Sequence, residues 1–213
     1  MSGDPTGDPA LQQAIAALAP PGLLIGHRLI APGDESALLP AEAAAMASMA
    51  VDRRRASGAA RQVARALMAR LGYAQLSILK SASGAPIWPA GLCGSIAHDD
   101  RVAVAALGLR RDIAAVGIDV EPTVPLPADM LDLIATPDEL RTIADDPLGG
   151  KLLFAAKEAV YKAVHPLDGV FLEFHDIAVD LAGRTATTRT GRVLSLRYCL
   201  SSHVVVLASA QIE

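Results

Sequence analysis

The segment Gly117–Glu121 reads GIDVE and follows a run of small apolar residues. Because the side chains of a β-strand alternate between its two faces, Asp119 and Glu121 point to one side, and Ile118 and Val120 point to the other. We interpret the segment as a strand whose apolar side chains face the core and whose two carboxylates lie on the solvent side. Mg²⁺ commonly takes one or two carboxylates and completes its octahedron with waters and phosphate oxygens. The segment therefore suits a magnesium site, and the alternative is an edge strand that simply turns its polar side to water.

A helix is predicted downstream over Lys151–Val164, where a His-Pro pair follows and should end it. Phe154, Glu158 and Lys162 recur every four residues and share one stripe of this helix. The apolar face of the helix is formed by Leu153, Ala156, Val160 and Ala163. Either the stripe presents Glu158 and Lys162 to an active site as acid and base, or the two side chains form a solvated pair. Such a pair contributes only ~0.2–0.5 kcal/mol to the stability of a helix.

A third segment, residues 84–100, reads GAPIWPAGLCGSIAHDD and contains Trp88, the only tryptophan. A short strand over Gly94–Ala97 delivers His98 at its end, where a ring nitrogen could donate to a phosphate oxygen. An isolated histidine is more often structural. The Ser-x-x-His spacing does not indicate a hydrolytic triad, because triads are defined by three-dimensional roles and no nucleophile-elbow motif is present.

The whole chain reads as helices followed by strands, twice over. The predicted elements are an amphipathic helix over Leu11–Leu18, two helices over Pro40–Leu71 that break at Gly58 and end at Gly72, strands over Leu76–Leu79, Gly94–Ala97, Val102–Leu107 and Val116–Val120, a helix from Pro137 with a capping box of Thr136 and Glu139, the helix over Lys151–Val164, and strands over Val170–Leu181, Val193–Leu200 and His203–Ala210. This order predicts an α+β fold of two similar halves with mostly antiparallel strands. The halves would be residues 10–110 and 111–213, after a loose lead-in over residues 1–9.

The composition favours a globular protein of the cytoplasm. Of 213 residues, 52% are apolar and only 3% aromatic, which excludes a disordered chain and predicts an aliphatic core. The net charge of −4 argues against a nucleic-acid partner, because duplex-binding domains are usually basic. Cys93 and Cys199 form no C-x-x-C pattern, so neither a disulfide framework nor a zinc site is indicated. No Lys or Arg precedes Arg28 and no apolar run approaches the ~20 residues that span a bilayer, so we expect no signal peptide and no membrane segment.

The three segments together resemble a known family. They read GAPIWPAGLCGSIAH, GIDVE and FAAKEAVYK, and they are similar to the motifs G-x-P-x-W-P-x-G-x-x-G-S-[IL]-[ST]-H, G-[IV]-D-x-E and F-[SA]-x-K-E-[AS]-x-[YF]-K of the 4′-phosphopantetheinyl transferase superfamily, in its surfactin-type and enterobactin-synthetase-component-D-like group. The resemblance spans about Arg53 to Lys162. It implies an enzyme that uses Mg²⁺, or Mn²⁺ in its place, to transfer the 4′-phosphopantetheine arm of coenzyme A to a serine of an acyl, aryl or peptidyl carrier protein, releasing 3′,5′-ADP. Two halves fused in one chain fit a monomer.

The resemblance also implies roles for particular residues. Asp119 and Glu121 match the family's magnesium carboxylates, and Glu158 matches a glutamate that is a third metal ligand or the base that activates the carrier serine. We expect catalytic roles for Glu158, Lys162 and His98, metal ligands at Asp119, Glu121 and Glu158, and coenzyme A contacts at Arg53, Arg61, His98, Asp119, Lys157 and Lys162. Arg54 or Arg55 could serve in place of Arg53.

The chain departs from the family pattern at two positions. Ala85 stands where surfactin-type members often carry a lysine, and Ala97 stands where a hydroxyl residue usually precedes the histidine. These changes bear on coenzyme A affinity more than on the reaction. Two other classes of function stay open: a non-catalytic module that binds coenzyme A or a carrier protein, and a metal-dependent phosphohydrolase that uses the same carboxylates on water.

Overall fold

The computed structural model describes residues 8–212, so the predicted lead-in lies outside the described residues as far as Gly7. The helices are α1 (Pro9–Ala16), α2 (Pro40–Ala45), α3 (Val51–Arg70), α4 (Ala128–Ile134), α5 (Pro137–Ile143) and α6 (Gly149–Asp168), with 3₁₀ turns η1 (Asp34–Ala37) and η2 (Phe174–Asp176). The strands are β1 (Leu23–Leu29), β2 (Leu92–His98), β3 (Val102–Leu109), β4 (Ile113–Pro122), β5 (Ile177–Asp180), β6 (Thr185–Thr188), β7 (Val193–Leu200) and β8 (His203–Gln211).

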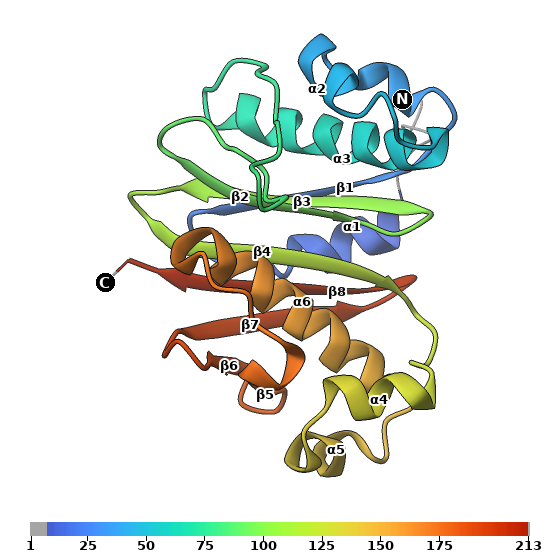
Figure 1. The fold of residues 1–213 in the computed structure, drawn as a ribbon, viewed down its shortest axis with the longest axis vertical. Helices are drawn as coiled ribbons and strands as arrows, with labels where there is room; N and C mark the ends of the chain where they lie inside the picture. The colour runs from blue at the N-terminus through green and yellow to red at the C-terminus, as the bar shows by residue number, and fades with distance from the viewer. Residues whose placement is uncertain (1–7, 213) are drawn as a thin grey trace.

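Two antiparallel sheets form the framework (Figure 1). The first has the strand order β1-β3-β2, and the second has the order β4-β8-β7-β6-β5. The register places Ile96 opposite Ala105 in the first sheet and Asp119 opposite Val206 in the second. The predicted α+β fold with antiparallel strands is confirmed.

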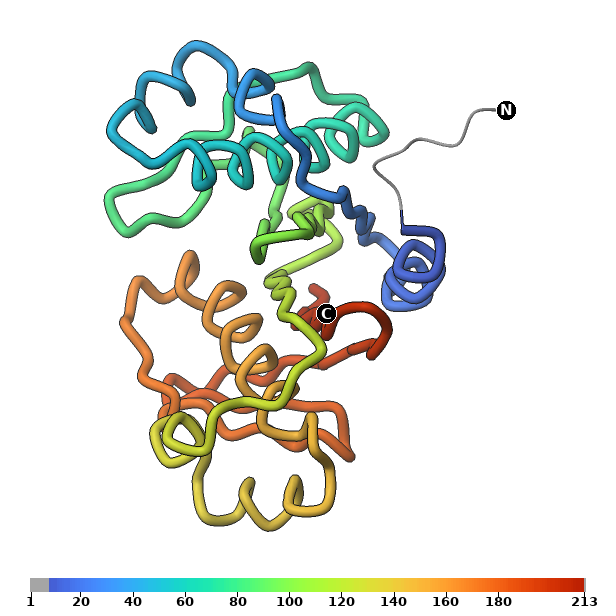
Figure 2. The backbone as a smooth tube through the Cα atoms, turned by 90° about the vertical axis from the view of Figure 1, so that its right-hand side faces the viewer, coloured from blue at the N-terminus to red at the C-terminus, as the bar shows by residue number. Residues whose placement is uncertain are grey.

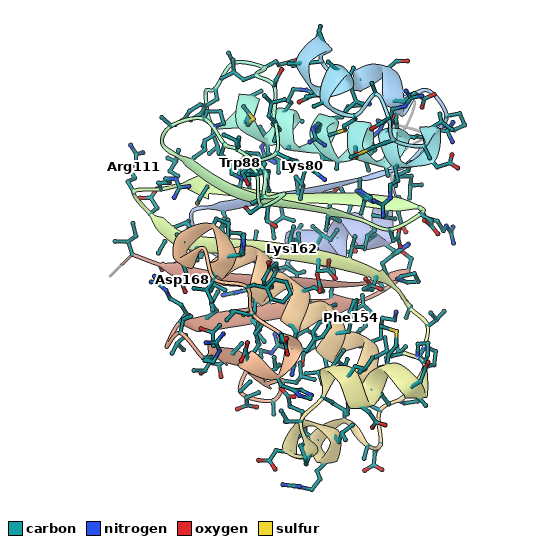
Figure 3. All side chains as sticks on the ribbon, viewed as in Figure 1. Lys80, Trp88, Arg111, Phe154, Lys162 and Asp168 are labelled. Carbon is teal, nitrogen blue, oxygen red and sulfur yellow. The ribbon has the colours of Figure 1, made fainter. Side chains whose placement is uncertain are left out.

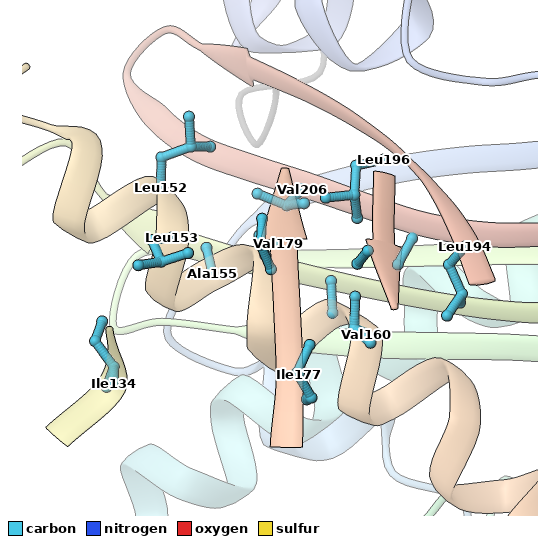
Figure 4. Packing of buried hydrophobic residues seen from close by; sticks show 14 of the residues in the cluster. Ile134, Leu152, Leu153, Ala155, Val160, Ile177, Val179, Leu194, Leu196 and Val206 are labelled. Atoms are coloured by element: carbon cyan, nitrogen blue, oxygen red, sulfur yellow. The ribbon is translucent and has the colours of Figure 1, made fainter. Parts of the chain in front are cut away.

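One long helix covers each sheet, and a further apolar layer joins the two sheets. In Figure 1, α3 lies along the outer face of the first sheet and α6 lies against the second. Figure 4 shows the contact of α6 with the second sheet, where Leu153 and Val160 of α6 belong to one apolar cluster with Val206 of β8. Between the sheets, Leu11 of α1 packs in one cluster with Ile118 of β4. Strand β4 is therefore buried on both of its faces.

Helix α6 lies close against β4 at Gly117. A Cβ atom on Gly117 would lie 1.9 Å from the carbonyl oxygen of Ala159, so only glycine permits this contact. Asp119 and Glu121 share the strand face of Gly117, because side chains on a strand repeat every two residues. The glycine of the GIDVE segment therefore sets both carboxylates against α6.

The helical region over residues 40–71 divides at a different place from the one predicted. The break lies between α2 and α3, and Gly58 lies inside α3. A Cβ atom on Gly58 would lie 2.0 Å from the carbonyl oxygen of Asp34, so this glycine allows η1 to pack on α3 and does not end a helix. Gly72 is confirmed as the cap of α3, with a φ of +83°. Its N–H donates to the carbonyl oxygen of Ala69 at 3.0 Å.

Several other predicted boundaries were wrong. Leu76–Leu79 is not a strand, and only an isolated bridge between Lys80 and Pro86 forms nearby. Helix α6 continues past Pro166 to Asp168, because a proline in the last turn removes a single hydrogen bond and Gly169 then ends the helix. The strand predicted over Val170–Leu181 is confined to β5, and β1 and β6 were not predicted.

Two predictions for the second half of the chain are confirmed. The strand over Val193–Leu200 is confirmed as β7, and the capping box at the start of α5 is formed by Thr136 and Glu139. Both cysteines are free. No helix within residues 8–212 combines the length and the apolar character that a bilayer crossing requires.

Candidate active site

A cavity of about 360 Å³ lies between α6 and the first-sheet layer, which consists of the first sheet, α3 and the loop after α3. Its lining includes Arg61 of α3, Lys80 and Ala85 of the following loop, His98 of β2, and Glu158, Tyr161, Lys162 and His165 of α6. In Figure 2 the loop after α3 and the C-terminal end of α6 face each other on one side of the molecule. Figure 3 labels Lys80 and Lys162, which belong to the two facing walls of the cavity, the loop after α3 and helix α6. The fold thus brings His98, Glu158 and Lys162 together from separate segments of the chain.

Asp119 lies beneath this cavity and is almost completely buried. The residue is 4% exposed, and Lys162 Nζ donates to its Oδ1 at 2.5 Å. Its Oδ2 is also buried and has no hydrogen-bond partner among the described residues. Burial raises the pKa of Asp119 to about 7 against the opposing effect of Lys162, and the charges of Glu121 and Glu158 add to the rise. The expectation that this carboxylate faces solvent is wrong, because α6 covers it.

Glu121 lies one step further along the same strand face and is partly exposed. Lys151 Nζ, from the first turn of α6, donates to Glu121 Oε2 at 3.1 Å. Each of the two carboxylates of β4 is thus paired with a lysine of α6, Asp119 with Lys162 and Glu121 with Lys151.

The carboxylates suit a magnesium ion only in part. Within residues 8–212, no three His, Cys, Asp or Glu side chains are grouped closely enough to hold a metal ion, so Asp119, Glu121 and Glu158 do not form a ready-made trio. Mg²⁺ nevertheless needs only one or two protein carboxylates when waters and phosphate oxygens complete its shell. The buried Oδ2 of Asp119, which lacks a hydrogen bond, is an oxygen of the required kind. The residues present therefore fit an ion that is shared with a phosphate ligand.

His98 ends β2 and borders two cavities. Partial desolvation holds the pKa of His98 below its ordinary value, and the positive charges of Lys162, Lys80 and Arg53 lower it further against the opposing effect of a backbone hydrogen bond with Asp99. A neutral imidazole can donate one hydrogen bond to a phosphate oxygen. The three cations near the ring favour an anion there, and the carboxylates of Asp52, Asp99 and Asp100 also line the second cavity.

Arg61 contributes to the cavity wall from an almost fully buried position. Its Nε donates to the carbonyl oxygen of Ile78 at 2.9 Å and its Nη1 to that of Ser57 at 3.2 Å. Its Nη2 is buried and has no hydrogen-bond partner among the described residues. Burial lowers the pKa of Arg61, and Glu42 opposes that effect. Arg61 thus holds the loop after α3 in place from within the cavity wall.

Arg53 lies apart from Arg61. It is exposed in the first turn of α3 and lines the second cavity beside His98 and Asp100. Arg55 is held in ion pairs with Glu35 at 3.2 Å and Asp52 at 2.9 Å. Because Arg55 is already paired, Arg53 is the more available of these two cations.

Lys157 was expected to contact coenzyme A, and the structure places it elsewhere. Its side chain is completely buried on the far side of α6, where Nζ donates to Glu139 Oε2 at 2.8 Å and to the carbonyl oxygen of Ile134 at 2.7 Å. The same amine also donates to the carbonyl oxygen of Phe174. Lys157 therefore joins α6 to α5 and η2, and it does not reach the cavity.

Lys80 and Tyr161 are among the lining residues that the sequence motifs did not indicate. Lys80 lies in an irregular loop, where desolvation and the charges of Arg61 and Arg53 lower its pKa. It places a cation in the wall that also contains Ala85, the position where a family lysine is absent. Tyr161 is the other residue, and its ring lies between those of His165 and Phe171, with centroids 5.1 and 5.8 Å away.

The sequence matches known families along most of its length. Residues 41–108 match the family model of the 4′-phosphopantetheinyl transferase N-terminal domain, and residues 115–211 match that of the 4′-phosphopantetheinyl transferase superfamily. These two matches cover β2 and most of β3 in the first sheet, nearly all of the second sheet, and every residue of the cavity wall, whereas β1 lies outside them.

Individual relatives support the same family assignment. The chain is 38% identical to 4′-phosphopantetheinyl transferase Svp of Streptomyces mobaraensis, over 82% of this chain and 75% of that protein. It is 37% identical to 4′-phosphopantetheinyl transferase PptT of Mycobacterium tuberculosis, over 74% of this chain and 70% of that protein. It is 34% identical to enterobactin synthase component D of Escherichia coli, over 44% of this chain and 47% of that protein. The chain therefore belongs to the 4′-phosphopantetheinyl transferase superfamily and is an enzyme of that kind.

Proposed function

We propose that the cavity between the first-sheet layer and α6 binds coenzyme A and that the enzyme transfers its 4′-phosphopantetheine arm to a serine of a carrier protein. The observation that carries this proposal is the convergence of Lys80, His98 and Lys162 on one cavity that Glu158 also lines. A diphosphate bears several negative charges, so cations and donors fixed in advance favour both its binding and its cleavage. Residues 10–110 would supply most phosphate contacts, and residues 111–213 would supply the carboxylates and the catalytic helix.

The phosphates of coenzyme A would be shared between the two adjoining cavities. Arg53 and His98 face the second cavity, so we assign them to the 3′-phosphate of the nucleotide. Lys80 and Arg61 lie in the main cavity and are assigned to the diphosphate side, where Lys80 takes the place of the lysine that is absent at Ala85.

Asp119 and Glu121 would hold a magnesium ion, for which Mn²⁺ can substitute because both ions accept octahedral oxygen ligands. When bound, the ion supplies polarisation of the diphosphate oxygens. Lys162 contacts Asp119 and also lines the cavity, so its ammonium group can stabilise the charge that appears on the departing 3′,5′-ADP.

Glu158 is proposed as the general base. It lines the cavity that would hold the diphosphate, and a third metal ligand is its alternative role. Its carboxylate would accept the proton of the carrier serine while the serine oxygen forms a bond to phosphorus. The bond between that phosphorus and the bridging diphosphate oxygen breaks, and 3′,5′-ADP leaves with the electron pair.

The carrier would approach over an exposed apolar patch at the cavity mouth, made of Leu167, Val170 and Phe171. These residues directly follow His165 and Pro166 of the cavity wall, and Phe171 contacts Tyr161 of the same wall. Acyl, aryl and peptidyl carriers are the substrate class. We place the enzyme in the cytoplasm, an assignment supported by its two free cysteines. We further propose that it is a monomer, because both halves of the fold belong to one chain.

Mass spectrometry of a panel of apo carrier proteins tests the proposal. With coenzyme A and Mg²⁺, at least one carrier should gain the mass of one phosphopantetheine arm, and 3′,5′-ADP should appear in equal amount. Phosphopantetheine released without any carrier would instead identify a phosphohydrolase. Coenzyme A binding without release of 3′,5′-ADP from any carrier would identify a binding module.

A further inference from the structure

Lys151 occupies a position where a lysine is unfavourable unless it has a partner. It is the third residue of α6, in the first turn, where the helix dipole is positive and acidic side chains are preferred. It is also only 8% exposed, and an ammonium group removed from water is costly unless it is paired. The partner is Glu121, at 3.1 Å, and the ring of Phe154 lies 5.8 Å from the same nitrogen.

This pair is one half of an arrangement that encloses the carboxylates of β4. Lys151 and Lys162 are eleven residues apart, or roughly 16 Å along α6, whereas Asp119 and Glu121 are about 7 Å apart along β4. The two amines therefore approach the carboxylate pair from its two ends, and each takes one oxygen of its own partner. The other oxygen of each carboxylate is left for a further ligand.

The two lysines differ in their access to the cavity. Lys162 lines it and can touch a substrate, whereas Lys151 is not part of the cavity wall. Lys151 therefore acts on the site only through Glu121. A fixed positive charge beside a carboxylate repels a divalent cation that binds the same group.

We propose that Lys151 is a built-in counter-cation for Glu121 that compensates the carboxylate in the metal-free enzyme and sets how tightly the site binds a divalent cation. The inference rests on the proposed assignment of Asp119 and Glu121 to the metal. In the metal-free protein Lys151 limits the repulsion between two neighbouring negative charges. In the loaded protein its charge opposes that of the metal, so the affinity is held below what the two carboxylates alone would give.

The test is a titration of the full chain with Mn²⁺, followed through the electron paramagnetic resonance signal of the free ion, with and without coenzyme A. Lys151→Met removes the charge and keeps an apolar chain of similar length. We expect the metal-free variant to melt at a lower temperature and its dissociation constant for Mn²⁺ to fall by about tenfold. Lys151→Arg keeps the charge and should stay close to wild type in affinity.

Two controls separate this role from a general effect. Arg141→Met removes one exposed positive charge that is paired with Asp138, so it should leave the Mn²⁺ affinity unchanged. In a Glu121→Gln background the Lys151→Met change should no longer raise the affinity, because the group through which it acts is gone. Should Lys151→Met fail to fold, Lys151→Gln carries the same prediction, since it keeps a hydrogen-bond donor without the charge.

A lower melting temperature with an unchanged or weaker Mn²⁺ affinity would show that Lys151 is only structural and would overturn the proposal. Absence of Mn²⁺ binding by the wild type, even with coenzyme A, would overturn it as well. Neither result depends on transfer activity. A failed transfer assay with normal Mn²⁺ titrations would instead count against the proposed function alone.

Discussion

Lys162 Nζ lies 2.5 Å from Asp119 Oδ1, so the ion pair of this lysine is made with β4 and not with Glu158 of its own helix. A Glu and a Lys four residues apart on a helix are commonly neighbours on a solvated face. Here the lysine turns toward the second sheet, and its partner is a buried carboxylate. Lys162 thus links the buried carboxylate of Asp119 to the cavity that the lysine itself lines.

Lys162→Ala should lower kcat by about a hundredfold or more, which corresponds to about 2.7 kcal/mol of barrier. The expected cause is loss of a cation beside the departing 3′,5′-ADP together with loss of the partner of Asp119. Steady-state kinetics with both substrates saturating measure the effect. Lys162→Arg keeps the charge but replaces a compact ammonium by a planar fork, so a deep loss there would show that placement matters. Full activity of Lys162→Ala would remove the residue from the mechanism.

The raised pKa of Asp119 predicts that stabilisation by Mg²⁺ grows with pH. Its pKa of about 7 exceeds the ordinary 3.8, so the folded protein binds the extra proton more tightly than the unfolded chain does. The contribution of this group to metal-free stability is therefore full below about pH 4 and is lost as the pH rises through about 7. A divalent cation binds the ionised carboxylate, so the rise in Tm caused by Mg²⁺ should be larger at about pH 8 than at about pH 6.

Thermal melts with and without Mg²⁺ at the two pH values measure this difference. Asp119→Asn cannot ionise at this position, so its response to Mg²⁺ should be small and nearly independent of pH. An equal Mg²⁺ effect on the wild type at both pH values would contradict the assignment of Asp119 to the metal.

The sequence was sufficient where a local pattern determines the position of a side chain. Strand alternation correctly placed Asp119 and Glu121 on one face, opposite Ile118 and Val120. The pattern could not show that α6 would cover that face, because the contact depends on Gly117 and Ala159, which are 42 residues apart in the chain. The burial of Asp119, and with it the raised pKa, therefore became visible only in three dimensions.

Two errors have different physical origins. Lys157 was assigned to coenzyme A through its place beside Glu158, yet neighbouring residues of a helix point about 100° apart and need not share a site. Helical geometry alone could have raised this objection. Lys80 was missed because it lies in an irregular loop, and no periodic pattern indicates that the buried Arg61 holds that loop against the cavity by binding Ile78.

Arg53 and Arg61 should respond differently to replacement by alanine. Arg53 is exposed, so Arg53→Ala should raise KM for coenzyme A severalfold with little change in kcat or Tm, as expected for a contact made equally in the ground and transition states. Arg61 binds two backbone carbonyl oxygens in the interior, so Arg61→Ala should also lower Tm. The measurements are kinetics and thermal melts on both variants.

The control for these variants is Arg111→Ala, which removes an exposed arginine far from the cavity (Figure 3). It should change neither KM nor Tm. The wild type should also use 3′-dephospho-coenzyme A less well than coenzyme A. Equal use of the two substrates would show that the 3′-phosphate contact assigned to Arg53 does not exist.

The apolar patch at the cavity mouth predicts a variant that loses carrier recognition alone. Phe171 is 69% exposed, so Phe171→Ser removes little from the core, but it takes away the largest apolar surface that a docking carrier could cover. We expect KM for the carrier to rise about tenfold while KM for coenzyme A and Tm stay near wild type, as measured by kinetics with each substrate varied in turn. Leu133→Ser is the matched control, because Leu133 is 67% exposed on α4 and lies outside the cavity wall. If both variants raise KM for the carrier equally, or neither does, the carrier docks elsewhere on the enzyme.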